Sequence, residues 1–269
     1  MAAKDRNSPV FDEGLAYDLL PPVTRWVVAS PVVARYPRCH HANVELRTAY
    51  LDQAMDQVML SLSTTQSSPH MKIRLVLLGG GYDLRLIRTA LKYNATTAGA
   101  ENNTNTTATI TRSNVIAETI EVDLPQVIEA KRRLLVERFL KRRPELKHII
   151  DNVQTFPADL NDLDGVHRLL QESILVPSSN DDNLMTVFVL EAVLIYLDEG
   201  IPSQLLELLS QAVRTAKGMG ALLIADTLPL SDVDASEELA RTELKKLGWT
   251  LKDWNIKPGR TRHLGWATT

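Results

Sequence analysis

An apolar segment that ends in three consecutive glycines constrains the fold of this chain more than any other feature. Residues 75–78 are Leu-Val-Leu-Leu, Gly79 to Gly81 follow, and Tyr82 and Asp83 precede a new helical pattern. A continuous run of branched apolar side chains is typical of a strand buried on both faces of a parallel sheet. Glycines at its carboxyl end let the backbone approach a ligand closely, and open α/β sheets bind ligands at that end. The segment therefore predicts a buried strand that leads into a nucleotide-like cofactor site.

The rest of the chain alternates between strand-like and helical patterns, which predicts an α/β fold with a doubly wound, mostly parallel sheet. We expect a single domain over residues 1–269, with an N-terminal helical cap at residues 1–65. The five expected strands cover residues 73–79, 115–122, 153–157, 184–190 and 221–225, and residues 264–268 could supply a last one. Helices are expected at residues 10–62 and 84–92, from Pro125, from Pro202 to Val213, and at residues 236–247.

Composition excludes several classes of protein. The net charge is −3 without a concentrated basic block, so nucleic-acid binding has no electrostatic support. Basic side chains between Lys131 and Arg143 are more typical of a solvated helix face than of a nucleic-acid patch. Residues 93–114 are rich in Asn and Thr and nearly lack large apolar groups, which predicts a mobile surface loop.

The expected location is cytoplasmic. Cys39 is the single cysteine, so no disulfide can form within the chain, which fits a reducing compartment. No apolar run reaches the ~18 residues that a membrane span needs, and the first residues lack an apolar signal core.

Acidic residues recur where expected strands end. Asp123, Asp159 and Glu191 stand at the ends of the second, third and fourth strands, and Gly79 and Gly81 at the end of the first. Parallel strands bring their carboxyl ends to one edge of the sheet, so these residues should share a cleft. Each acid taken alone could equally cap the next helix. All of them together, beside a glycine turn, favour a ligand site.

The glycine turn lacks the features that bind phosphate groups. A dinucleotide fingerprint needs G-x-G-x-x-G, but Leu84 occupies the third glycine position. The lysine and hydroxyl residue of a P-loop are also absent. These differences disfavour an NAD-dependent dehydrogenase and favour a cofactor without phosphate, such as S-adenosyl-L-methionine (SAM).

Several motifs, in this order and spacing, resemble the leucine carboxyl methyltransferase family over about residues 20–269. They are ELRTAYLD (45–52), VLLGGGYD (76–83), IEVDLPQVIEAKR (120–132), FPADLNDL (156–163), LEAVLIYL (190–197) and HLGWATT (263–269). The resemblance implies a class I methyltransferase-like Rossmann fold, SAM as cofactor, and O-methyltransferase activity. Methyl transfer to an ionised carboxylate needs no general base, so we expect no catalytic side chain and no metal.

The resemblance also implies which residues bind the cofactor. A planar arginine would make two parallel bonds to the carboxylate of the cofactor, which lysine would not. The implied set is Arg47 for the carboxylate, Gly79 and Gly81 for the methionine portion, Asp123 for ribose, Asp159 and Leu160 for adenine, and Glu191 beside the amino group. Tyr196 fits the same motif as Glu191 but could equally belong to the core.

The resemblance implies, as acceptor, the C-terminal leucine of a protein phosphatase 2A-type catalytic subunit. Two departures from the family bear on this. Ala225-Asp226-Thr227 stands where members carry Tyr-Glu-Gln, and residues 249–263 are much shorter than the corresponding acceptor region. A small-molecule acceptor, a modified tRNA base and a non-catalytic cofactor-binding protein therefore stay open as alternatives.

Overall fold

The computed structural model describes residues 14–20, 38–64, 71–94, 115–176, 184–232, 234–256 and 263–269. The expected loop at residues 93–114 lies outside this part, except that Tyr93 and Asn94 end a helix instead. Of the expected N-terminal cap, two helices are described, α1 (Gly14–Leu19) and α3 (Arg38–Thr64). The rest of that cap lies outside the described residues.

The described strands form one seven-stranded sheet in the order β3-β2-β1-β4-β5-β7-β6. Neighbouring strands are parallel, except that β7 runs antiparallel to both β5 and β6. The strands are β1 (Lys72–Leu78), β2 (Ile116–Asp123), β3 (Val153–Pro157), β4 (Leu184–Glu191), β5 (Met219–Asp226), β6 (Thr250–Ile256) and β7 (His263–Thr268). The doubly wound, mostly parallel sheet is confirmed. The antiparallel β7 departs from the dinucleotide-binding order 3-2-1-4-5-6.

Strand β6 was not predicted, because its buried residues do not alternate. Its register with β7 shifts between Leu251 and Asp253, as at a β-bulge. The buried residues Leu251 and Trp254 are therefore three positions apart instead of two. This spacing hides the period of two by which a strand is recognised in a sequence.

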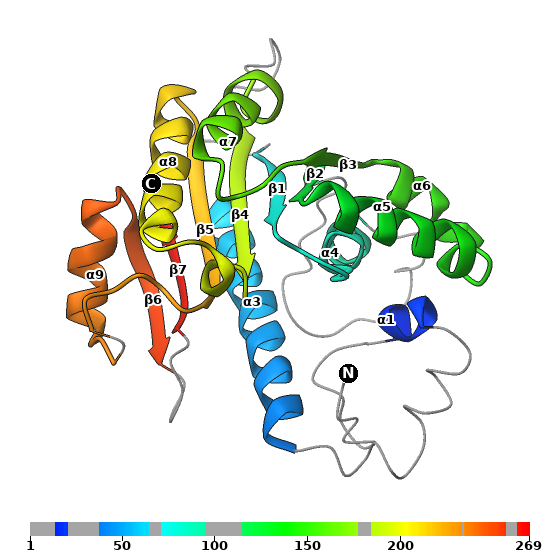
Figure 1. The fold of residues 1–269 in the computed structure, drawn as a ribbon, viewed down its shortest axis with the longest axis horizontal. Coiled ribbons are helices and arrows are strands. Elements are labelled where there is room, and N and C mark those ends of the chain that lie inside the picture. Colours follow the sequence, from blue (N-terminus) through cyan, green and yellow to red (C-terminus); the bar gives the residue numbers. More distant parts are fainter. Residues whose placement is uncertain are drawn as a thin grey trace.

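Helices cover both faces of the sheet (Figure 1). Alternate side chains of β1 point to opposite faces. Leu75 and Leu77 belong to the core with α3, whereas Val76 and Leu78 belong to the core with α7 and α8. The remaining helical elements are α4 (Arg85–Asn94), α5 (Pro125–Leu134), η2 (Leu135–Phe139), η3 (Pro144–Leu146), α6 (Lys147–Asp151), α7 (Leu163–Leu169), η4 (Leu170–Ile174), η5 (Leu194–Tyr196), α8 (Ile201–Thr215) and α9 (Glu237–Lys246).

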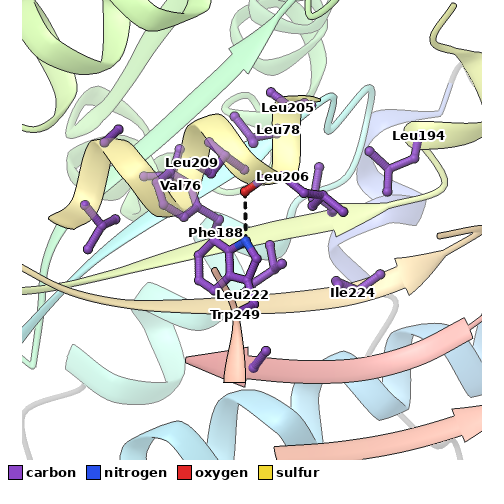
Figure 2. Packing of buried hydrophobic residues seen from close by; sticks show 14 of the residues in the cluster. Val76, Leu78, Phe188, Leu194, Leu205, Leu206, Leu209, Leu222, Ile224 and Trp249 are labelled. Carbon is purple, nitrogen blue, oxygen red and sulfur yellow. Dashed lines mark hydrogen bonds between the residues drawn. The ribbon is translucent and has the colours of Figure 1, made fainter. Parts of the chain in front are cut away.

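Trp249 anchors the larger core, between α8 and the sheet (Figure 2). Its side chain is fully buried, and its indole N–H donates to the backbone oxygen of Leu206 at 2.8 Å. A buried indole N–H needs such a partner. The bond ties the segment before β6 to α8, and so fixes the antiparallel edge of the sheet against the parallel part.

None of the described helices is long and apolar enough to cross a membrane.

Candidate functional site

The glycine turn follows β1 at the point where the strand order reverses between β1 and β4. Ligands bind at such a switch point in open α/β sheets. Gly79 and Gly81 both have positive φ, +63° and +54°, which other residues adopt at a cost. A Cβ on Gly79 would lie 2.2 Å from Cγ2 of Val193, whereas one on Gly81 would meet no atom within 4 Å. Gly79 is therefore required by packing, while Gly81 faces open space.

Asp123 connects the end of β2 to this turn. Its Oδ2 accepts a hydrogen bond from the backbone N–H of Gly81 at 2.7 Å, and its Oδ1 accepts one from Leu124 at 2.7 Å. The side chain is buried. The two residues that the sequence placed at neighbouring strand ends are thus in direct contact, and the carboxylate fixes the position of the turn.

Arg47 and Glu191 meet at the end of β4. The Nε of Arg47, from the first half of α3, lies 2.8 Å from Oε1 of Glu191. Among the described residues, Glu191 is the ion-pair partner of Arg47, and it is contacted through Nε alone. The two terminal guanidinium nitrogens of Arg47 therefore keep their donor capacity. The structure therefore brings together Arg47 and Glu191, although 144 positions separate them in sequence.

Arg85 was not predicted as part of the site. Its side chain is 4% exposed, and its Nη2 donates to the second oxygen of Glu191 at 2.6 Å. It also contacts Asp52 at 2.6 Å and Asp83 at 3.2 Å. The sequence signals only that Arg85 needs a partner, because an arginine within the apolar run Leu84 to Ile87 should either break that run or be paired.

Burial and charge act in opposite directions on the pKa values of this cluster. Burial raises the pKa of Asp83, but Arg85, Arg88 and Lys131 lower it by more, so the net shift is downward. Burial lowers the pKa of Arg85, yet the three carboxylates raise it overall. At Asp52 burial outweighs the nearby arginines, and the pKa is raised.

The segment after β3, which contains Asp159 and Leu160, lies next to Asp123 but divides into two environments. The backbone N–H of Ala158 donates to the backbone oxygen of Asp123 at 2.9 Å. Leu160 is buried in the core below the turn, and its Cδ1 would lie 3.7 Å from a Cβ on Gly79. Asp159 is exposed, and its Oδ1 accepts from the N–H of Asn161. Asp159 is therefore near the site without a bond to the other predicted residues in the described part of the chain.

Lys131 corrects the interpretation of its helix as a solvated basic face. Arg132 and Arg133 are exposed, but Lys131 is buried. Its Nζ donates to Oε1 of Glu121 at 2.6 Å and to the backbone oxygen of Asp83 at 2.5 Å. Burial raises the pKa of Glu121 in spite of this partner. Lys131 thus holds the backbone at Asp83, in the turn after β1. A cavity of about 330 Å³ is lined by Lys131, Glu121 and Asp83, but it reaches none of the predicted cofactor residues.

Asp226 has a structural role behind Glu191. This fully buried acid stands in the Ala225-Asp226-Thr227 segment. Its Oδ2 accepts from the backbone N–H groups of Val193 and Leu194 at 2.5 and 2.7 Å. It thereby fixes the chain immediately after Glu191.

Tyr196, which the sequence left open between the site and the core, is 75% exposed. The alternative that placed it in the core is wrong.

A comparison with known protein families finds a match over part of the chain. Residues 111–210 match the model of the leucine carboxyl methyltransferase family. This segment includes Asp123, Asp159, Leu160 and Glu191, whereas Arg47 and the glycine turn precede it. The resemblance inferred from the motifs is therefore confirmed over these residues. No curated protein sequence is significantly similar to the chain.

Solved structures with a similar fold share little sequence with this chain. One, described as a pericyclic reaction enzyme, is 11% identical with a TM-score of 0.43, over 91% of this chain and 54% of that chain. Magnesium protoporphyrin IX methyltransferase from Synechocystis PCC 6803, with bound SAM, is 13% identical with a TM-score of 0.40, over 91% and 94%. Aeropyrum pernix fibrillarin with natively bound SAM is 16% identical with a TM-score of 0.35, over 77% and 71%. The chain spans about half the length of the first. Similarities at this level carry no argument about activity or substrate.

Proposed function

We propose that this chain is a SAM-dependent O-methyltransferase that acts on a carboxylate. The observation that carries the proposal is the contact of Asp123 with Gly81 beside the Arg47–Glu191 pair, at the edge of the sheet where α/β folds bind ligands. The family match over residues 111–210 supports it independently.

The polar groups around the turn fit those of SAM in kind and charge. Asp123 accepts two backbone hydrogen bonds, and a carboxylate has about four acceptor positions, which leaves capacity for the two ribose hydroxyls. Glu191 suits an ammonium group and Arg47 a carboxylate. A Cβ on Gly81 would meet no atom within 4 Å, so the backbone there offers open space to a ligand. Leu160 would contribute apolar surface to adenine, and Asp159 would accept from the exocyclic amine.

The reaction places few chemical demands on the side chains. The bound cofactor supplies a methyl group on a positively charged sulfur. An acceptor carboxylate has an ordinary pKa of about 3.5, so it is ionised at neutral pH and no residue has to remove a proton. The protein contributes by aligning the two reactants and by excluding water. No catalytic base is therefore assigned.

For the acceptor we propose the C-terminal leucine carboxylate of a protein phosphatase 2A-type catalytic subunit. The description of the matched family supports this choice. Tyr82, which follows Gly81, and Tyr196, which follows Glu191 by five positions, are exposed and could offer aromatic surface to an apolar leucine side chain. A cytoplasmic location belongs to the same proposal, and the single cysteine, Cys39, fits a reducing compartment.

Calorimetry with SAM and S-adenosylhomocysteine tests cofactor binding. Arg47→Ala and Asp123→Ala each remove a hydrogen bond to a charged group, worth about 1.5–3 kcal/mol, so each should weaken binding about 10- to 100-fold. Glu118→Ala is the matched control, because Glu118 lies on the same strand as Asp123 but pairs with Arg74 toward its other end. The control should bind normally.

Transfer of a labelled methyl group tests the acceptor. We expect label on a phosphatase C-terminal tail that ends in leucine, and none on the same tail without that leucine. If the parent protein binds neither compound, the methyltransferase proposal is refuted. If both compounds bind and the two tails are labelled equally or not at all, only the proposed acceptor is refuted.

A further inference from the structure

Arg85 connects three separate segments of the chain around the proposed cofactor site. Its Nη1 lies 2.6 Å from Oδ1 of Asp52 on α3, and its Nη2 lies 2.6 Å from Oε2 of Glu191 at the end of β4. Its Nε lies 3.2 Å from Oδ2 of Asp83 in the turn after β1. Each guanidinium nitrogen thus contacts a different carboxylate.

This arrangement differs from an ordinary surface ion pair. A buried guanidinium is costly unless its donors are satisfied, and the side chain of Arg85 is 4% exposed. Its rigid planar fork requires the three carboxylates to lie in fixed directions around one plane. Arg85 therefore determines where Asp52, Asp83 and Glu191 stand relative to one another.

The two arginines on Glu191 are not equivalent. Arg85 contacts one carboxylate oxygen from the buried side, while Arg47 contacts the other with a side chain that is 17% exposed. A ligand that enters from solvent can displace Arg47 without uncovering Arg85. Arg85 would then keep Glu191 oriented through its Oε2 while Arg47 turns to an incoming anion.

Asp52 extends this control to Arg47 itself. Both residues lie on α3, five positions apart, and Asp52 is the α3 residue that Arg85 contacts. The pair of Asp52 and Arg85 therefore holds α3 against the turn. Its loss would move Arg47 as well as Glu191.

We propose that Arg85 is a positioning residue that makes the site selective for a nucleoside bearing a zwitterionic amino-acid end. It does so by orienting Glu191 toward the ammonium group and by placing α3 so that Arg47 reaches the carboxylate. The inference rests on the proposed function, because the amino-acid end is that of SAM. It predicts that Arg85 contributes to binding of the amino-acid end and not of the nucleoside.

Two ligands separate these contributions, S-adenosylhomocysteine and 5′-methylthioadenosine, which lacks the amino-acid end. In Arg85→Gln, we expect the affinity for S-adenosylhomocysteine to fall about tenfold or more, and the affinity for methylthioadenosine to change less than about threefold. Arg85→Lys keeps the charge but not the fork, so it should restore little of the selectivity.

Arg74→Gln is the matched control. Arg74 is also a buried arginine of this sheet, and it contacts Glu118 through two nitrogens at 2.5 and 3.2 Å. It lies on β1 before the site, so its removal should lower stability and leave the ratio of the two affinities unchanged. Thermal unfolding of each variant measures the common structural effect.

The outcomes distinguish this inference from the proposed function. Equal weakening of both ligands by Arg85→Gln overturns the positioning role and leaves a structural one. Failure of the parent protein to bind S-adenosylhomocysteine refutes the proposed function instead. If Arg85→Gln does not fold, Asp52→Asn replaces it, since it retains the guanidinium and removes the charge that holds α3. A several-fold loss for S-adenosylhomocysteine alone supports the role, and equal or no loss overturns it.

Discussion

Substitution of alanine at two glycines of the same turn should mainly lower stability at Gly79 and mainly weaken binding at Gly81. Gly79 and Gly81 share a left-handed backbone, which costs a residue with a Cβ about 1–2 kcal/mol. At Gly79 the new Cβ would also lie 2.2 Å from Cγ2 and 3.0 Å from Cβ of Val193. Val193 is β-branched and cannot easily change rotamer, and its backbone N–H is held by Asp226.

The stability costs follow from these contacts. Overpacking adds about 1–3 kcal/mol, so Gly79→Ala should lower the free energy of unfolding by about 2–5 kcal/mol. Gly81→Ala meets no atom within 4 Å and should cost only the backbone term of about 1–2 kcal/mol. The methyl group of Gly81→Ala, however, occupies the space that the proposed cofactor needs. The affinity of the Gly81→Ala variant for S-adenosylhomocysteine should therefore fall by about tenfold or more.

Urea unfolding and calorimetry on the same samples measure both effects. Gly248→Ala is the control, because Gly248 also has a positive φ, +88°, and a Cβ there would lie 2.5 Å from Oγ of Ser210. Gly248 stands before the first residue of β6, away from the carboxyl ends of β1, β2 and β4 where the proposed site lies. This variant should therefore lose stability and bind normally. The reasoning is refuted if Gly81→Ala binds like the parent protein, or if it destabilises as much as Gly79→Ala.

Three further substitutions test the environment of the site. The lowered pKa of Asp83 gives stability above its unfolded pKa of about 3.9, which is lost as pH falls through the folded value. The difference in unfolding free energy between the parent and Asp83→Asn should therefore shrink from pH 5 toward pH 2, as urea titrations at several pH values would measure. Trp249→Phe removes the indole donor to the oxygen of Leu206 and part of a fully buried ring, so the unfolding free energy should fall by about 1–3 kcal/mol; an unchanged urea midpoint would contradict this. Asp226→Asn turns an amide N–H₂ toward backbone donors such as Thr227 N–H, and should cost a similar ~1–3 kcal/mol in the same assay.

The strands that could be predicted are those whose burial follows a simple pattern. Residues 75–78 are buried on both faces, so their apolar run is continuous, and the helix after β2 begins at Pro125 as expected. The bulge in β6 interrupts the alternation of buried and exposed residues, so a search for a period of two does not detect this strand. The antiparallel direction of β7 depends on β6 as well, because the two strands form a hairpin at the edge of the sheet.

The site residues that could be predicted are those placed by strand ends. Asp123 and Glu191 end β2 and β4, so parallel topology alone brings them to one edge. Arg85 and Lys131 were missed because their partners come from other segments, and a sequence gives no direct signal of which charge a buried cation will meet. Arg85 contacts three carboxylates from separate segments, and Lys131 holds the backbone of Asp83 in the turn. Both roles depend on tertiary packing.

Charge balance connects the cluster to the kind of ligand it suits. Three guanidiniums, of Arg47, Arg85 and Arg88, lie among the carboxylates of Asp52, Asp83 and Glu191. An added lone anion or cation would leave an uncompensated charge in a partly buried place, which is unfavourable. A zwitterion adds no net charge, because its ammonium and carboxylate can each take one partner from the Arg47–Glu191 pair. An amino-acid end can therefore replace the Arg47–Glu191 ion pair by exchange of partners, at no net change in charge.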